Sequence, residues 1–154
     1  MRNRSFLLLV VSLGACAGAP PVPTPVASGQ HVAPCPDSPN CVSTAEPAAD
    51  AEHHAEPFVY AGTVADAKAR MKAHVATLPR TALVGESDTS LSFTYTSKTM
   101  GFVDDVEIVF VPDGEAGGRV EYRSASRVGH GDMGVNRARM EALAAGWAGA
   151  GTTR

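Results

Sequence analysis

The chain has 154 residues, a length that suits one domain and leaves little room for two. Hydrophobic residues make up 44% and charged residues 19%, a composition typical of a globular domain rather than a membrane-embedded bundle or a disordered acidic tail. The formal net charge of -3 argues against a broad basic surface, so we expect no nucleic-acid partner.

The N-terminal residues have the layout of a secretory signal peptide. Arg2 and Arg4 provide positive charge, and the stretch 6–13 is apolar except at Ser12. An apolar stretch this short cannot span the ~30 Å hydrocarbon core of a bilayer as a helix. We therefore predict that residues 1–15 are a signal peptide that is removed during export.

The end of this signal peptide, Leu13-Gly14-Ala15-Cys16, resembles the lipobox of bacterial lipoproteins. In proteins with that motif the cysteine receives diacylglycerol, the chain is cut before it and the new amino terminus is acylated, for example with palmitate. Three acyl chains exceed the two signals that stable membrane anchoring needs. The resemblance implies lipidation at Cys16 and a lipid-anchored place in the bacterial cell envelope. The alternative is an ordinary secreted protein in which Cys16 is incidental.

The residue after the lipobox cysteine is Ala17. In Gram-negative lipoproteins an aspartate at this place usually signals retention in the inner membrane. For a Gram-negative source, the alanine implies the periplasmic face of the outer membrane. Residues 16–34 are then a lipidated tether, rich in proline and without acidic or basic charge, and a single domain is expected over residues 35–150.

The two remaining cysteines, Cys35 and Cys41, are an even number in an oxidising compartment. The segment between them holds two prolines and turn-forming Asp, Ser and Asn, which can bring the Cα atoms within the ~4.4–6.8 Å that a disulfide requires. A metal pair and a redox dithiol are the alternatives. The spacing matches the C-x-x-C pattern of neither, so a structural disulfide is favoured and no metal site or cofactor is predicted.

Residues 42–56 are polar and irregular, and we predict that they form a loop over the domain or are partly disordered. This segment contains His53 and His54 among several acidic residues. Adjacent histidines on a flexible loop can bind a transition metal weakly, but a metal site requires a fixed geometry. We interpret the two histidines as solvated.

Beyond Pro57 the sequence becomes periodic, beginning with a short strand over residues 58–60. Thr63 is a candidate helix N-cap with Asp66 three residues on. Apolar residues recur at helical spacing after it, at Ala67, Met71, Val75 and Leu78. Pro79 is expected to end this helix.

Two hairpins follow, formed by residues 81–87 with 90–97 and by residues 102–111 with 118–126. Asp132 is the expected cap of a final helix that runs to about Trp147. The predicted order is β-α-β-β-β-β-α. It defines a single α+β domain with a four- to five-stranded antiparallel sheet and two helices on one face.

Pairing the second hairpin so that Glu107 faces Arg123 places its apolar residues on one face, the core face. Asp104 then also falls on the core face, opposite Ser126. A buried carboxylate needs a partner or loses its charge, and Arg127 and Arg137 are the nearest candidates in the sequence.

The final helix also carries a polar residue on its inner face. Met133, Asn136, Met140, Leu143 and Trp147 share that face by helical spacing. An inward amide such as that of Asn136 must form hydrogen bonds, because an unsatisfied buried group costs about 1–3 kcal/mol.

These polar residues are expected to converge where the last strand leads into the last helix, as a set of Asp104, Asp105, Glu107, Arg123, Ser124, Ser126, Arg127, Asn136 and Arg137. One interpretation is a structural network that holds the helix to the sheet. The other is a binding site for a small anionic ligand, because arginine can bind a carboxylate or phosphate through two parallel hydrogen bonds.

Four segments resemble the signature blocks of one family, and they occur in the same order. They are Cys35-Pro36-Asp37-Ser38-Pro39-Asn40-Cys41-Val42-Ser43, Gly101-Phe102-Val103-Asp104-Asp105-Val106-Glu107, Arg123-Ser124-Ala125-Ser126-Arg127-Val128-Gly129 and Gly134-Val135-Asn136-Arg137-Ala138-Arg139. The family is the uncharacterised bacterial and plastid domain of unknown function 1499. The resemblance runs from about Cys35 to Trp147 and implies membership without a biochemical activity.

Two classes of function remain open. The first is a non-enzymatic domain, tethered to a membrane through its N-terminal lipid, that binds an envelope protein or a small anionic ligand. The alternative is a hydrolase in which Asp104 or Asp105 is the base and Ser124, Ser126 or a water is the nucleophile, with His130 nearby. The chain contains no G-x-S-x-G motif, metal-ligand spacing or phosphate-binding loop, so no catalytic residue is assigned.

Overall fold

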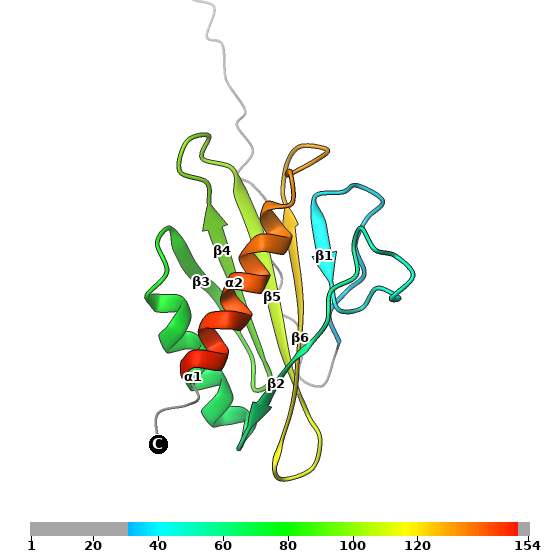
Figure 1. Ribbon diagram of the computed structural model, residues 1–154. Coiled ribbons are helices and arrows are strands. Elements are labelled where there is room, and N and C mark those ends of the chain that lie inside the picture. Colours follow the sequence, from blue (N-terminus) through cyan, green and yellow to red (C-terminus); the bar gives the residue numbers. More distant parts are fainter. Residues whose placement is uncertain (1–30, 151–154) are drawn as a thin grey trace, which may run out of the picture.

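The computed structural model describes residues 31–150, with side chains as far as Trp147. The predicted signal peptide, the lipidation site Cys16 and tether residues 16–30 lie outside the described residues. The elements are β1 (Cys41–Ser43), β2 (Phe58–Ala61), α1 (Val64–Ala76), β3 (Thr81–Glu86), β4 (Ser90–Thr96), β5 (Val103–Pro112), β6 (Gly117–Ser126) and α2 (Val135–Ala150). Both helices lie on the same face of the sheet, which confirms the predicted α+β class (Figure 1).

The sheet of the described residues is antiparallel and has six strands in the order β1-β6-β5-β4-β3, with β2 also paired to β6. The predicted register is confirmed, since Glu107 faces Arg123 and Asp104 faces Ser126. The predicted strand number of four to five was too low. The three residues of β1 are too few for an alternating pattern, and the strand exists because its backbone pairs with β6.

Local signals predicted the beginning of α1 correctly. The Thr63 hydroxyl accepts a hydrogen bond from the Asp66 backbone N–H at 3.1 Å and donates to Oδ2 of Asp66 at 2.7 Å. The helix ends at Ala76, three residues before the proline that was expected to end it. Arg80 then adopts a left-handed backbone with φ of 57° before β3 begins.

At the start of α2, the Asp132 carboxylate accepts hydrogen bonds from the backbone N–H groups of Gly134 and Asn136, at 2.9 and 2.7 Å. Met133 has a φ of 55° and is fully exposed. Its predicted place on the inner face of the helix was wrong, because α2 begins only at Val135. The other four residues predicted for that face are buried.

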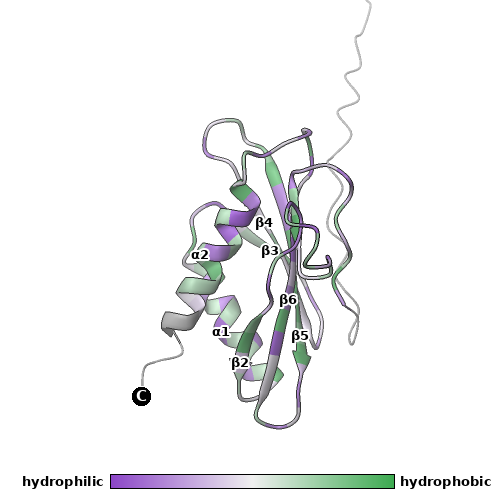
Figure 2. Ribbon diagram, turned by 45° about the vertical axis from the view of Figure 1, so that its right-hand side comes forward, coloured by the Kyte–Doolittle hydropathy of each residue, from purple (hydrophilic) through white to green (hydrophobic). Residues whose placement is uncertain are grey.

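The hydrophobic core lies between the helices and the sheet, and the residues of its main cluster come from positions 42 to 147. The central strands contribute Phe93, Val106, Ile108 and Phe110, whose side chains are at most 1% exposed. Hydrophobic and hydrophilic residues are interleaved along the strands in Figure 2, as one-sided burial requires. Among the described residues, no helix is long and apolar enough to cross a membrane.

The last residues of the predicted tether pack against the domain. Val32 is 4% exposed, and the Ser43 hydroxyl donates a hydrogen bond to the Ala33 carbonyl oxygen at 2.8 Å. Nδ1 of His31 lies 2.7 Å from Oε2 of Glu121 on β6. The folded part of the chain therefore includes residues 31–34, the end of the predicted tether.

The loop between β1 and β2 is ordered against the domain rather than solvated. Its backbone is bonded to β1, since the N–H of Ser43 donates to the His53 carbonyl oxygen at 2.9 Å. The interpretation of His53 as solvated was wrong: it is 8% exposed, and its Nδ1 lies 2.9 Å from Oδ2 of Asp50. No group of three or more potential metal ligands occurs in the part of the chain that the structure describes.

The His53–Asp50 pair predicts a pH-dependent contribution to stability. The hydrogen bond with Asp50 raises the pKa of His53 above 6.5, and the same bond lowers the pKa of Asp50 below 3.8. The His53–Asp50 pair therefore stabilises the fold fully at pH values between these two ordinary pKa values. This stabilisation is lost as the pH rises through the raised pKa of His53. We expect His53→Gln to lower the melting temperature more at pH 6 than at pH 8.5. An equal reduction at both pH values would contradict a role for the protonated ring.

Cys35 and Cys41 form the predicted disulfide, with their Cα atoms 5.7 Å apart. In this form the pair offers no free thiolate to a metal ion. The bond closes the loop that leads into β1, next to His53, whose Nε2 lies 3.3 Å from the Ser38 carbonyl oxygen.

Reduction of this disulfide is expected to lower the free energy of unfolding by about 2 kcal/mol, the low end of the usual range, because the closed loop is short. Urea denaturation with and without a phosphine reductant measures the loss. A Cys35→Ser/Cys41→Ser variant is the control, since its stability is expected to match that of the reduced protein and not to respond to reductant. A reductant effect of the same size on that variant would contradict the assignment.

Candidate functional site

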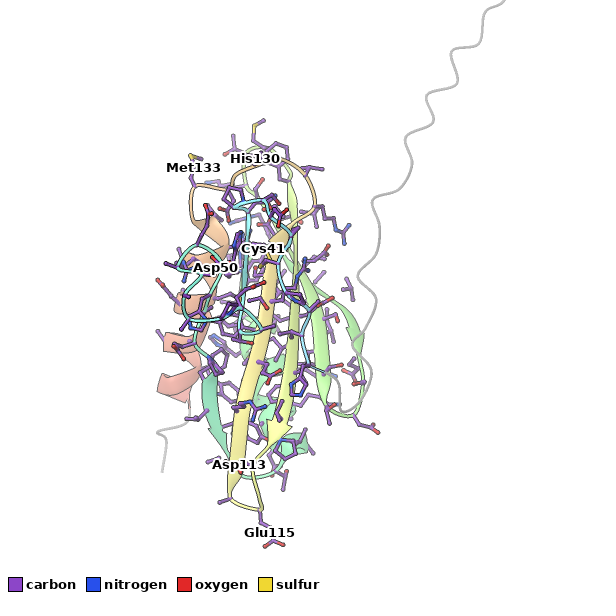
Figure 3. The ribbon with its side chains drawn as sticks, turned by 90° about the vertical axis from the view of Figure 1, so that its right-hand side faces the viewer. Cys41, Asp50, Asp113, Glu115, His130 and Met133 are labelled. Atoms are coloured by element: carbon purple, nitrogen blue, oxygen red, sulfur yellow. A yellow bond between two sulfur atoms is a disulfide. The ribbon has the colours of Figure 1, made fainter. Side chains whose placement is uncertain are left out.

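The predicted polar cluster is a hydrogen-bonded group at the edge of the sheet where β5 begins and β6 ends, next to the start of α2. We call it the junction network, and its members are Asn40, Asp104, Ser124, Ser126, Asp132, Asn136 and Arg139. It lies near the end of the molecule that carries Cys41, His130 and Met133 in Figure 3.

Asn136 is the centre of the junction network and is fully buried. Its Nδ2 lies 3.0 Å from the Asn40 carbonyl oxygen, 3.0 Å from Oγ of Ser126 and 2.8 Å from Oδ2 of Asp132. Its Oδ1 accepts hydrogen bonds from the Ser124 hydroxyl and from Nη1 of Arg139. The amide thus joins the disulfide loop, the last strand and the last helix, with all of its hydrogen-bonding groups in use.

Asp104 is 5% exposed, and its partner is Arg139, whose Nη2 donates to Oδ2 at 2.5 Å. The guanidinium group of Arg139 also lies over the ring of Tyr95, 4.6 Å from its centroid. The predicted partners Arg127 and Arg137 were therefore wrong. Helical spacing could have indicated Arg139, because it lies three residues after the inward-facing Asn136.

Asp105 points to the other face of the sheet, where it pairs with Arg127. Nε and Nη2 of the guanidinium group donate to the carboxylate at 2.9 and 2.8 Å, a two-point contact that raises the pKa of Arg127. Both side chains are at most 19% exposed. Asp105 occupies the Nε/Nη2 edge of this guanidinium group and neutralises its charge, which weakens its attraction for an anionic ligand.

Glu107 and Arg123 face each other on that same outer face of the sheet. Burial raises the pKa of Glu107, and the charge of Arg123 opposes this effect. Nε of Arg123 is buried and has no hydrogen-bond partner among the described residues. These two residues lie on the opposite face from Asn136, so they do not belong to the junction network.

Arg137, also predicted for the cluster, points away from it. Its Nη2 donates to the carbonyl oxygens of Ala51 and Glu52, the latter at 3.0 Å. The structure therefore brings four of the predicted residues together, Asp104, Ser124, Ser126 and Asn136. The other five lie outside the network: Asp105, Glu107, Arg123, Arg127 and Arg137. Asn40 and Arg139 were not predicted for the cluster, and Asp132 was predicted only as the cap of the last helix.

The chemistry of the junction network is that of a closed set of paired groups. The hydroxyls of Ser124 and Ser126 are bonded to the Asn136 amide, which is not a base. The Asp104 carboxylate is bonded to a guanidinium group, and His130 is exposed with no contact to these hydroxyls. The arrangement supplies neither an activated nucleophile nor a general base aimed at one.

A cavity of about 450 Å³ adjoins the junction network and shares Arg139 with it. It lies between the end of α1, the end of β4 and the first half of α2. The lining residues are His74, Leu78, Pro79, Arg80, Tyr95, Thr96, Ser97, Lys98, Val135, Arg139, Ala142 and Leu143.

The fold and this network define an α+β domain in which a buried amide joins an antiparallel sheet to its last helix. Residues 31–146 match the model of the family described as protein of unknown function DUF1499, and the chain belongs to that family. The match confirms the resemblance noted from the four sequence blocks. No curated protein and no solved structure matches the chain.

Proposed function

We propose that this protein is a lipid-anchored component of the bacterial cell envelope whose domain binds a ligand or an envelope protein without catalysing a reaction. The signal-peptide layout and the lipobox before Cys16 support the anchor. The Cys35–Cys41 disulfide is what an exported protein in an oxidising compartment would carry.

The observation that carries the non-enzymatic part of the proposal is the closure of the junction network around Asn136. Its polar groups are paired with one another, so their role is to hold α2 and the disulfide loop against β6. A buried network of this kind rigidifies a domain when its members are satisfied. The hydrolase alternative requires a carboxylate that activates a serine or a water, and both candidate carboxylates are bonded to arginines instead.

The test of the anchor is the intact mass of the protein extracted from native membranes, with and without reduction and alkylation. We expect the mass of a chain that begins at Cys16 and carries three acyl chains, with two alkylatable thiols only after reduction. The mass of a chain without acyl groups would contradict the anchor, and thiols that react before reduction would contradict the disulfide.

A fluorophosphonate probe, which labels activated serines, tests the non-enzymatic part. We expect no labelling of Ser124 or Ser126. Labelling that is lost in Ser124→Ala or Ser126→Ala would overturn the proposal in favour of a hydrolase.

A further inference from the structure

The cavity beside the junction network has the size and lining of a small-molecule site. Its volume of about 450 Å³ lies within the ~300–1,000 Å³ range of such sites. Its apolar wall is made by Leu78 and Pro79 after α1 and by Ala142 and Leu143 on α2. A wall of this kind favours a ligand that has an apolar part.

The polar side of the cavity is cationic. Arg80, Lys98 and Arg139 line it, and none of the described lining residues is acidic. Arg139 is neutralised by Asp104, but neither Arg80 nor Lys98 forms an ion pair within the described residues. Nε of Arg80 is held by the Thr96 carbonyl oxygen at 3.0 Å, which leaves its Nη groups available. On a chain of net charge -3, two unpaired cations at one cavity favour an anion.

Exposed apolar side chains surround the same end of the domain. Val135 lines the cavity and is 46% exposed. In the turn between β4 and β5, Met100 is 66% and Phe102 is 48% exposed, within four residues of the lining residue Lys98. Met133, fully exposed, lies at this end in Figure 3, and the β4–β5 turn lies there in Figure 1. These exposed side chains add apolar surface at the same end of the domain as the cavity.

We infer that this cavity binds an organic anion with an apolar chain, such as a fatty-acid carboxylate. Arg80 and Lys98 hold the charged head group, and the chain lies along Leu143 and Val135 toward the exposed apolar residues. This inference deepens the proposed function and rests on it, since it names the class of ligand that the domain binds.

The test is calorimetric titration of the chain from Ala17 onward, which contains the complete core and the disulfide, with decanoate below its micelle concentration. We expect saturable binding of one decanoate. Decanol, which lacks the carboxylate, and acetate, which lacks the apolar chain, are each expected to bind at least tenfold more weakly than decanoate. Decyl phosphate distinguishes a carboxylate from a phosphate head group. No saturable binding of either anion to a chain that melts cooperatively would overturn the inference without touching the lipid anchor, which the intact mass tests separately.

A pair of matched double variants locates the site. Arg80→Gln/Lys98→Gln is expected to weaken decanoate binding about tenfold, because charge-assisted hydrogen bonds to the head group are lost. Lys72→Gln/Arg119→Gln removes the same charge outside the cavity, from exposed residues paired with Glu86 and Glu121. It is expected to leave the affinity unchanged. Equal weakening in both double variants would show non-specific attraction and overturn the site.

The variant Val135→Glu separates binding from folding. Val135 is exposed at the first position of α2, where a negative charge is favourable for the helix, so the melting temperature is expected to stay the same. The new carboxylate at the cavity is expected to reduce decanoate affinity more than tenfold. Unchanged affinity would place the ligand elsewhere.

Discussion

Replacing Asn136 with alanine is expected to lower the free energy of unfolding by about 3–5 kcal/mol, the largest loss that we predict for one uncharged side chain. The substitution removes the acceptor of the buried Ser124 hydroxyl and of Nη1 of Arg139. Each buried group left unsatisfied costs about 1–3 kcal/mol, and the small cavity adds to this. Urea denaturation followed by circular dichroism measures the loss.

The neighbouring residue provides the control for this experiment. Arg137→Ala removes a side chain whose contacts are exposed hydrogen bonds to the loop carbonyls, so we expect a loss of less than about 1 kcal/mol. If Asn136→Ala costs no more than Arg137→Ala, the junction network is not what holds α2 to the sheet. The proposal of a structural role would then be wrong.

Replacing Asp104 with alanine is expected to cost about 3–5 kcal/mol, because it leaves the largely buried guanidinium group of Arg139 without its counter-charge. The loss comes mainly from the unpaired charge rather than from the pair itself. Arg139→Met retains much of the apolar stem and removes that charge, so the double variant Asp104→Ala/Arg139→Met is expected to be more stable than the sum of the two single effects predicts.

The surface pair Lys72–Glu86 gives the matched comparison for Asp104. Both of its side chains are more than 40% exposed, and we expect Glu86→Ala to change the free energy of unfolding by less than about 1 kcal/mol.

Additive losses for Asp104→Ala and Arg139→Met would show that the two side chains do not depend on each other. That outcome would contradict the buried pair.

These two predictions also bear on the candidate site. Arg139 contacts Asp104, Asn136 and the ring of Tyr95, and it lines the cavity for which we propose a ligand. A stable junction network therefore positions one wall of that cavity. Arg80 and Lys98 lie outside the network, so their replacement tests binding with less effect on stability.

Much of the fold could be predicted because its signals are local. The alternation of Leu91, Phe93 and Tyr95 with polar residues predicted β4, and Thr63 predicted the start of α1. The register of β5 with β6 was also correct, because one face had to be apolar. The strand β1 was missed because it depends on pairing with a distant strand, β6.

For the candidate site, the sequence by itself determined that Asp104 and Asn136 face the core, because the periods of strand and helix place both side chains inward. Only the tertiary structure decided their partners. The rotation and position of α2 against β5 and β6 brought Arg139 to Asp104 and turned Arg137 toward the loop. Arg80, Lys98 and Arg139 became neighbours in the same way, because they come from three separate segments. Periodicity reports the direction of a side chain from its own element, whereas a partner depends on how two elements pack.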